Sequence, residues 1–252
     1  MPVIAVIGGT GFGEWVGLAG LSSRQVETPF GPALVQTGLL EGEPVLFLPR
    51  HGSPATVPPH RINYLANIQA LCDAGASAII GVTAVGSVDE RLVVPQFVIP
   101  DQIIDYTFGR PHTFFDDEIH HIDFSFPYDD GLRRRVIDAA RVISAGSGLP
   151  LKDHGVYGCT QGPRLESAAE INRLRRDGCD IVGMTAMPEV VLARERELPY
   201  AGLSVVVNAG AGLGGKAIDL SGIAAAMTRG MAGAREVVQQ VIATYSVDGS
   251  GS

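Results

Sequence analysis

The sequence is poor in cysteine and in positive charge. It contains three cysteines, Cys72, Cys159 and Cys179, among 252 residues. An odd number cannot all pair within one chain, and their spacing is not that of metal ligands, so we expect buried, reduced thiols and no bound metal. Lys and Arg number 19 against 27 Asp and Glu, which gives a formal net charge of -8. This balance argues against a nucleic acid as the main partner, because phosphate backbones require a basic surface.

Long apolar runs are also missing. Although 46% of the residues are hydrophobic, no run reaches the roughly 18 apolar residues of a membrane span, so we expect no membrane partner. The chain passes from Met1-Pro2 directly into an apolar run at residues 4–7, without the basic flank and cleavage site of a signal peptide. We therefore expect a cytoplasmic protein. Its length predicts a single domain over residues 1–246, followed by a flexible tail at 247–252.

Apolar runs with strand character alternate with amphipathic helical stretches, which indicates an α/β fold. The predicted strands lie at residues 4–7, 45–48, 78–82, 97–100, 155–159, 180–184 and 201–207. The predicted helices lie at residues 63–74, 131–145, 166–176, 188–197 and 221–245. The last helix has the strongest signal, because apolar residues recur every three or four positions from Ile223 to Val241.

Segments rich in glycine and proline lie between these elements, at residues 8–13, 50–59, 83–87, 162–163 and 208–215. In α/β sheets the loops that follow strand ends line the ligand crevice, so we look for the chemistry there. The first loop, residues 8–13, can hold an anion with its backbone N–H groups and the Thr10 hydroxyl. A tight turn without a ligand fits it equally well. A dinucleotide site does not, since the G-x-G-x-x-G spacing that starts at Gly9 ends on Glu14.

Six motifs follow one another along almost the whole chain. They are Ile7-Gly8-Gly9-Thr10-Gly11, Pro49-Arg50-His51-Gly52, Asn63-Tyr64-x-Ala66-Asn67-Ile68, Val82-Thr83-Ala84-x-Gly86-Ser87, Gly162-Pro163-Arg164 and the run from Met184 to Ala193. Together they resemble the trimeric purine nucleoside phosphorylase and methylthioadenosine phosphorylase family. The resemblance implies one domain with a central mixed, twisted sheet flanked by helices. It also implies a homotrimer that cleaves purine nucleosides with inorganic phosphate as co-substrate and without a cofactor.

By the same resemblance, a group of donors binds phosphate. These are Thr10, Arg50, His51, Thr83, the Ala84 amide and Thr185. The chemistry agrees, because arginine offers a planar fork to phosphate oxygens and threonine hydroxyls donate without adding charge. His51 and Thr185, together with Asn208, are the expected catalytic residues. Glu189 is expected to favour the first helical turn after Pro188 rather than to face the site.

The resemblance places Met184 under the ribose and Asn208 against the purine, followed two positions later by Gly210. Family members selective for 6-aminopurines carry aspartates at these two positions. A neutral amide offers both a donor and an acceptor, which suits O6 and a protonated N7. Glu166 matches the glutamate that accepts from N1–H of 6-oxopurines, and Leu165 stands where a phenylalanine usually stacks on the base. A 6-oxopurine nucleoside is therefore the expected substrate.

Three positions concern the 5' end of the sugar. Leu220 and Ile223 align with positions that are apolar in methylthio-selective members, and His121 matches a histidine that a neighbouring subunit lends to this pocket. Ala55 departs from the histidine of many methylthioadenosine phosphorylases. S-methyl-5'-thioinosine is the favoured substrate. The alternatives are a broad inosine/guanosine phosphorylase, a methylthioadenosine phosphorylase, or a purine-binding protein without activity.

Overall fold

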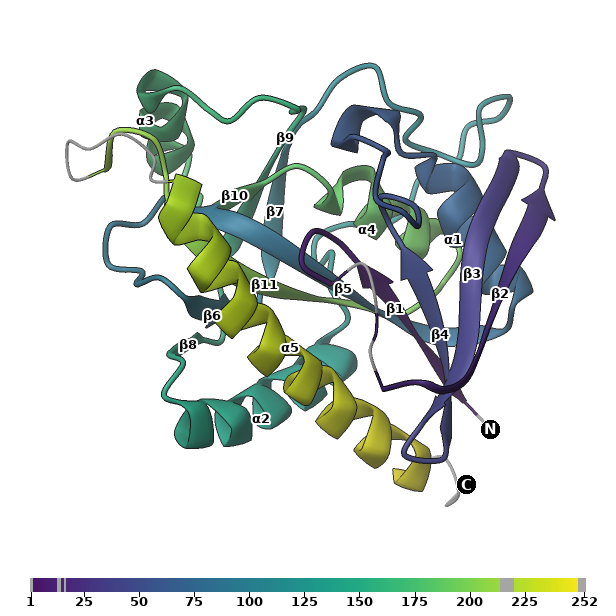
Figure 1. Ribbon diagram of the computed structural model, residues 1–252. Helices are drawn as coiled ribbons and strands as arrows, with labels where there is room; N and C mark the ends of the chain where they lie inside the picture. The colour runs from purple at the N-terminus through teal and green to yellow at the C-terminus, as the bar shows by residue number, and fades with distance from the viewer. Residues whose placement is uncertain (1, 13–14, 16, 214–219, 249–252) are drawn as a thin grey trace.

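A computed structural model describes residues 2–12, 15, 17–213 and 220–248 of the chain. Its strands form one mixed sheet with helices on both faces (Figure 1), as the sequence predicts. The strands are β1 (Val3–Gly8), β2 (Ala19–Thr28), β3 (Gly31–Leu40), β4 (Glu43–Pro49), β5 (Ala76–Ser87), β6 (Gln96–Val98), β7 (Gln102–Tyr106), β8 (Leu151–Lys152), β9 (Val156–Thr160), β10 (Ile181–Gly183) and β11 (Tyr200–Ala209). The helices are η1 (Pro59–Arg61), α1 (Tyr64–Asp73), α2 (Asp130–Ser147), α3 (Ala168–Arg176), α4 (Ala186–Glu195) and α5 (Leu220–Asp248).

The centre of the sheet is parallel. Strand β1 pairs with β4 and β5, and β11 pairs with β5. An antiparallel meander of β2, β3 and β4 extends one side, and β10, β9 and β7 extend the other. Strand β6 pairs with β11, and β8 with β6.

Strand β5 changes partner along one edge. Strand β11 occupies its other edge from Ile79 to Ser87. Along the edge where the partner changes, β1 pairs with β5 as far as Val82, and β10 pairs with β5 only from Gly86. Alternate peptide groups of a strand point to opposite edges. The Val82 carbonyl points to the β1 side, where it accepts from Arg50 at 2.9 Å, so the Ala84 peptide group faces the gap between β1 and β10.

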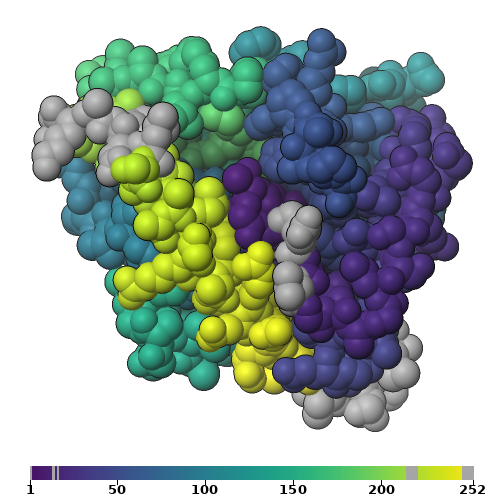
Figure 2. Space-filling model, in the orientation of Figure 1, coloured from purple at the N-terminus to yellow at the C-terminus, as the bar shows by residue number. Residues whose placement is uncertain are grey.

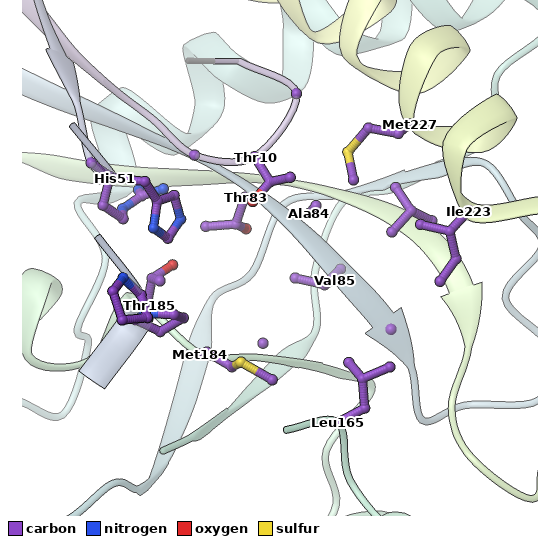
Figure 3. A pocket seen from close by; sticks show the side chains of 18 of the residues that line it. Thr10, His51, Thr83, Ala84, Val85, Leu165, Met184, Thr185, Ile223 and Met227 are labelled. Carbon is purple, nitrogen blue, oxygen red and sulfur yellow. The ribbon is translucent and has the colours of Figure 1, made fainter. Parts of the chain in front are cut away.

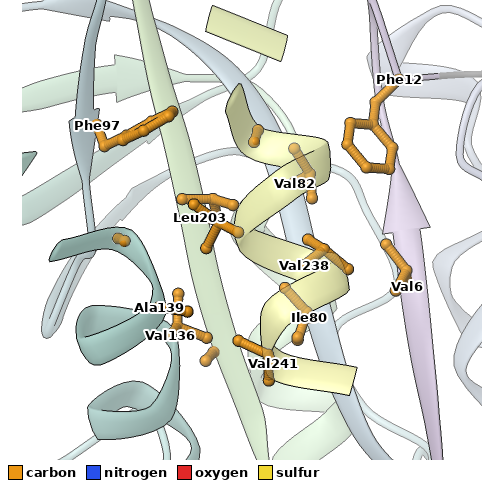
Figure 4. Packing of buried hydrophobic residues seen from close by; sticks show 14 of the residues in the cluster. Val6, Phe12, Ile80, Val82, Phe97, Val136, Ala139, Leu203, Val238 and Val241 are labelled. Atoms are coloured by element: carbon orange, nitrogen blue, oxygen red, sulfur yellow. The ribbon is translucent and has the colours of Figure 1, made fainter. Parts of the chain in front are cut away.

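Successive residues of the central strands alternate between two hydrophobic clusters, one on each face of the sheet. Val6 and Ile80 pack with residues of α2 and α5, whereas Ile7 and Ile79 pack with residues of α1 and α4. Figure 4 shows the first cluster, in which Val238 of α5 lies against the sheet. The strands are therefore covered on both faces, and the ligand site must lie at their ends.

The predicted elements are all present, with shifted ends. Helix α3 begins at Ala168 because Ser167 and Glu170 form a capping box, which leaves Glu166 in the preceding loop. Helix α5 reaches Asp248, two residues into the segment expected to be a flexible tail. Even so, no helix among the described residues has the length and apolarity needed to cross a membrane. The sequence patterns missed four strands, β2, β3, β7 and β8.

Candidate active site

A cavity of about 640 Å³ lies where β5 changes partner, and its walls come from strand ends and from α5. It collects most of the residues that the sequence marked for substrates. Those in its lining are Thr10, Arg50, His51, Thr83, Ala84, Leu165, Glu166, Met184, Thr185, Asn208, Gly210 and Ile223. Figure 2 shows α5, in yellow and yellow-green, on the face of the molecule beside the purple N-terminal segment.

One end of the cavity is polar. Figure 3 shows Thr10, His51, Thr83 and Thr185 gathered there, at a distance from Leu165 and Ile223. The Thr185 hydroxyl makes no capping bond to α4, although Thr185 is the N-cap residue. The hydroxyls at this end and the Ala84 peptide group can therefore donate to a small anion.

Arg50 is fixed at this end by a buried ion pair. Its Nε and Nη2 donate to the two oxygens of Glu189 at 2.7 and 2.9 Å, and both side chains are 1% exposed. The Tyr200 hydroxyl donates to the same carboxylate at 2.5 Å. Burial by itself lowers the pKa of Arg50, but the Glu189 carboxylate raises it above its ordinary value. The guanidinium thus stays charged at any physiological pH.

Glu189 lies in the first turn of α4 and outside the described cavity lining, as the sequence interpretation expects, but that interpretation missed its contact with Arg50. The carboxylate points inward and holds Arg50, which comes from 139 residues earlier in the chain. Gly81 makes room for the contact, since a Cβ there would lie 1.7 Å from the Tyr200 hydroxyl. The network orients a charge that a small anion can use.

His51 is held in one tautomer. Its Nδ1 lies 2.8 Å from the Val57 carbonyl oxygen, which can only accept, so Nδ1 carries the proton. Burial lowers the pKa of His51 below its ordinary 6.5, the bond to Val57 raises it, and the charge of Arg50 lowers it again. The neutral ring therefore presents an unprotonated Nε2 for a ligand.

The opposite end carries the groups expected to face a base. Asn208, near the end of β11, donates from Nδ2 to the Ala209 carbonyl at 2.8 Å, which leaves its oxygen free to accept. Gly210 is in tight contact with the main chain, because a Cβ there would lie 2.5 Å from the Ser87 carbonyl oxygen. An aspartate at position 210 therefore does not fit the present backbone. Leu165 lines the cavity while remaining 45% exposed.

Helix α5 forms an apolar wall. Ile223 and Met227 face the cavity one helical turn apart (Figure 3). Leu220 begins α5, but its side chain lies outside the described residues. Ala55 contributes to the lining. His121 does not belong to the lining among the described residues and is exposed on the same chain's surface.

A family model described as the phosphorylase superfamily matches residues 3–243. The chain belongs to this superfamily. It is 48% identical over 247 residues to a protein named probable S-methyl-5'-thioinosine phosphorylase from Pseudomonas syringae pv. tomato, covering 96% of this chain and 99% of the relative. It is 43% identical over 237 residues to the 6-oxopurine nucleoside phosphorylase of Pyrococcus furiosus, covering 91% and 88% of the two chains.

Solved structures of the superfamily share the fold. Methylthioadenosine phosphorylase from Schistosoma mansoni in complex with tubercidin superposes with a TM-score of 0.89 at 29% identity, covering 98% of this chain and 92% of that one. A methylthioadenosine phosphorylase from an antarctic soil metagenomic library gives a TM-score of 0.90 at 33% identity, with coverage of 97% and 86%. The mixed sheet of this phosphorylase is therefore the family's sheet.

Several residues in or behind the cavity wall were not singled out from the sequence, and Met227 and Ser204 are two of them. Met227 belongs to the apolar stripe of α5, and its position four residues after Ile223 is the signal that could have placed it in the cavity. Ser204 is fully buried on β11, with its hydroxyl 3.0 Å from that of Thr83. The apolar run of β11 does not predict this contact, because the contact depends on the pairing of β5 with β11.

Proposed function

We propose that this protein cleaves the N-glycosidic bond of a 6-oxopurine nucleoside with inorganic phosphate, and that S-methyl-5'-thioinosine is its preferred substrate. It is a pentosyltransferase of the purine nucleoside phosphorylase type. The observation that carries the proposal is the arrangement of one cavity, with anion donors at one end and the neutral amide of Asn208 with the carboxylate of Glu166 at the other. Phosphate is the co-substrate, and no cofactor takes part.

In the proposed reaction, phosphate lies among Thr10, Thr83 and Thr185 and attacks C1' from the face opposite the purine. The C1'–N9 bond breaks with oxocarbenium character at the sugar, and the configuration at C1' inverts. The proton that hydrogenphosphate loses on bonding to C1' is balanced by one that N7 takes from solvent, and Asn208 stabilises the departing base by accepting from this N7–H and donating to O6. Arg50 lines the cavity and can offer the anion the second hydrogen of Nη1, and its pairing with Glu189 keeps the guanidinium in place.

Glu166 supports the choice of a 6-oxopurine. A carboxylate accepts from the N1–H of hypoxanthine, whereas adenine presents a lone pair at N1. A buried mismatch of this kind can discriminate by factors of about 10⁴. At the other end of the sugar, Ile223 and Met227 give a 5'-methylthio group apolar contact and offer a 5'-hydroxyl no hydrogen-bond partner.

The proposed assembly is a homotrimer, in which the segment around His121 of one subunit completes the 5' pocket of the next. Its support is an unusual set of exposed apolar side chains on that segment. Phe108, Ile119 and Phe126 are 70%, 90% and 74% exposed. Three large apolar side chains this exposed on one segment favour a surface that a partner covers. The proposed compartment is the cytoplasm, which the unpaired thiols Cys72, Cys159 and Cys179 favour.

The test is a phosphate-dependent assay of S-methyl-5'-thioinosine, inosine, guanosine and S-methyl-5'-thioadenosine. S-methyl-5'-thioinosine should exceed inosine in kcat/KM by roughly 10 to 200-fold, the range that small apolar differences supply. Ile223→His should narrow this ratio by giving a 5'-hydroxyl a partner, whereas Ile223→Val should preserve it. Equal turnover of the two nucleosides would contradict the methylthio preference. Hypoxanthine binding without phosphorolysis would indicate a binding protein instead.

A further inference from the structure

Thr160 lies behind the base end of the cavity. It is the last residue of β9, one residue beyond Cys159, which pairs with Gly183 of β10. Its hydroxyl oxygen is 2.6 Å from Glu166 Oε1 and 3.4 Å from the Gly183 carbonyl oxygen. A hydroxyl has one hydrogen to donate, and the shorter contact to a charged oxygen takes it. Glu166 lines the cavity, and Thr160 is not among its described lining residues.

The loop that carries Glu166 is held in place without Thr160's hydroxyl. On one side the buried Arg110 donates to the carbonyl and side-chain oxygens of Gln161 at 2.9 and 3.0 Å. On the other side Arg164 binds the Glu170 carboxylate at 2.7 and 2.8 Å, and Glu170 also closes the capping box of α3. The backbone of Glu166 is thus fixed at both ends, and the Thr160 hydroxyl acts on the orientation of its carboxylate.

This contact divides the two oxygens of Glu166 between a protein donor and the base. Hypoxanthine presents one donor at this edge, N1–H. Guanine presents N1–H and an adjacent 2-amino group, and it is best matched by a carboxylate that offers both oxygens side by side. The short bond from Thr160 uses one of the two lone pairs of Oε1 and sets the orientation of the carboxylate, so the 2-amino group meets an oxygen that is already bonded and is a weaker acceptor. A buried donor with a weak partner costs binding free energy.

We propose that Thr160 is a positioning residue that reserves one oxygen of Glu166 and thereby favours hypoxanthine nucleosides over guanine nucleosides. The inference rests on the proposed function, since it takes Glu166 as the residue that faces N1 of the base. It narrows the substrate class within the 6-oxopurines. Thr160 acts through Glu166 and does not touch the substrate.

The experiment uses Thr160→Val, which keeps the shape of the side chain and removes the donor, and Thr160→Ser, which keeps the donor. The kcat/KM values for S-methyl-5'-thioinosine and S-methyl-5'-thioguanosine are measured, and the binding of free hypoxanthine and guanine is followed by calorimetry. The wild type should prefer hypoxanthine, Thr160→Val should reduce this preference by about tenfold, and Thr160→Ser should keep it. Thr160→Ala, which also lacks the donor, serves if Thr160→Val does not fold.

In a Glu166→Ala background, the donor-free variant should leave the ratio of the two bases unchanged, because the acceptor through which Thr160 acts is gone. The inference is overturned if the donor-free variants keep the wild-type ratio, or if they weaken both bases equally. The experiment distinguishes failure of this inference from failure of the proposed function. If the two bases bind in the expected ratios but the protein shows no phosphorolysis, the proposed function is wrong and the role of Thr160 stands.

Discussion

At the scale of single residues, the proposed reaction gives Asn208 two roles that an aspartate cannot combine. Its oxygen is free to accept from a protonated N7, while its nitrogen bonds the Ala209 carbonyl and keeps a second hydrogen for O6. Asn208→Asp should lower kcat/KM on S-methyl-5'-thioinosine by at least about tenfold, because an ionised carboxylate offers O6 no donor and repels its developing charge. Asn172→Asp, on α3 outside the cavity lining, is the matched control. Unchanged kinetics of Asn208→Asp would remove this residue from the base site.

The lowered pKa of His51 and its bond to Val57 lead us to predict that phosphate binding depends on pH. With a pKa below the ordinary 6.5, the free ring is neutral near pH 7, and its proton is committed to Val57. Contact between Nε2 and phosphate therefore requires one additional proton, on the ring or on the phosphate. The KM for phosphate should rise with pH above the second pKa of phosphate, by up to about tenfold per pH unit, while the KM for the nucleoside stays flat. His51→Asn should abolish the slope, and a flat wild-type profile would exclude the contact.

Most of the candidate site could be anticipated because its residues lie in short motifs that follow strand ends. The buried partners could not, because they depend on contacts between distant segments. Glu189 and Arg50 are 139 positions apart, and an isolated glutamate at the start of a helix has an adequate local explanation. The acceptor that fixes the His51 tautomer is likewise a backbone carbonyl, which no side-chain pattern identifies.

At the scale of elements, the Tyr200–Glu189–Arg50 network can pack against β5 because residue 81 of that strand is a glycine. Gly81→Ala would place a methyl group on the Tyr200 hydroxyl, so we expect a loss of about 2 kcal/mol or more in the free energy of unfolding and a higher KM for phosphate. Urea denaturation and steady-state kinetics measure the two effects. Gly146→Ala in α2 is the control, since a Cβ there meets nothing within 4 Å. Equal stability of the two variants would show that the network tolerates displacement.

The sequence patterns identified the central strands, which are buried on both faces. Strands β1, β5 and β11 are continuous apolar runs because both their faces are covered. Strand β2 was missed because most of its residues are exposed and polar, so it carries neither an apolar run nor a clear alternation. Strand β8 has two residues, which is too short for any periodic signal.

At the scale of the whole molecule, assembly should control activity. If His121 of one subunit completes the pocket of another, dilution to monomers should abolish turnover, since the 5' pocket loses a wall. Ile119→Asp should favour monomers by placing a charge on the exposed apolar segment. Val142→Asp, at a 62% exposed position of α2, is the control. Light scattering combined with activity measures both properties, and a fully active monomer would refute the shared site.

The change of partner along β5 has a consequence for solvent exchange. The Ala84 amide belongs to a 12-residue strand in which most residues are buried. It nevertheless faces the cavity instead of a neighbouring strand. In deuterium oxide it should exchange faster than its neighbours Thr83 and Val85, which point toward β11. Inorganic phosphate alone should slow that exchange before any nucleoside is added. An amide already protected in the free protein would contradict this. If phosphate binds there as proposed, the anion supplies the hydrogen bond that a neighbouring strand makes elsewhere in the sheet, and the substrate becomes part of the sheet's own bonding.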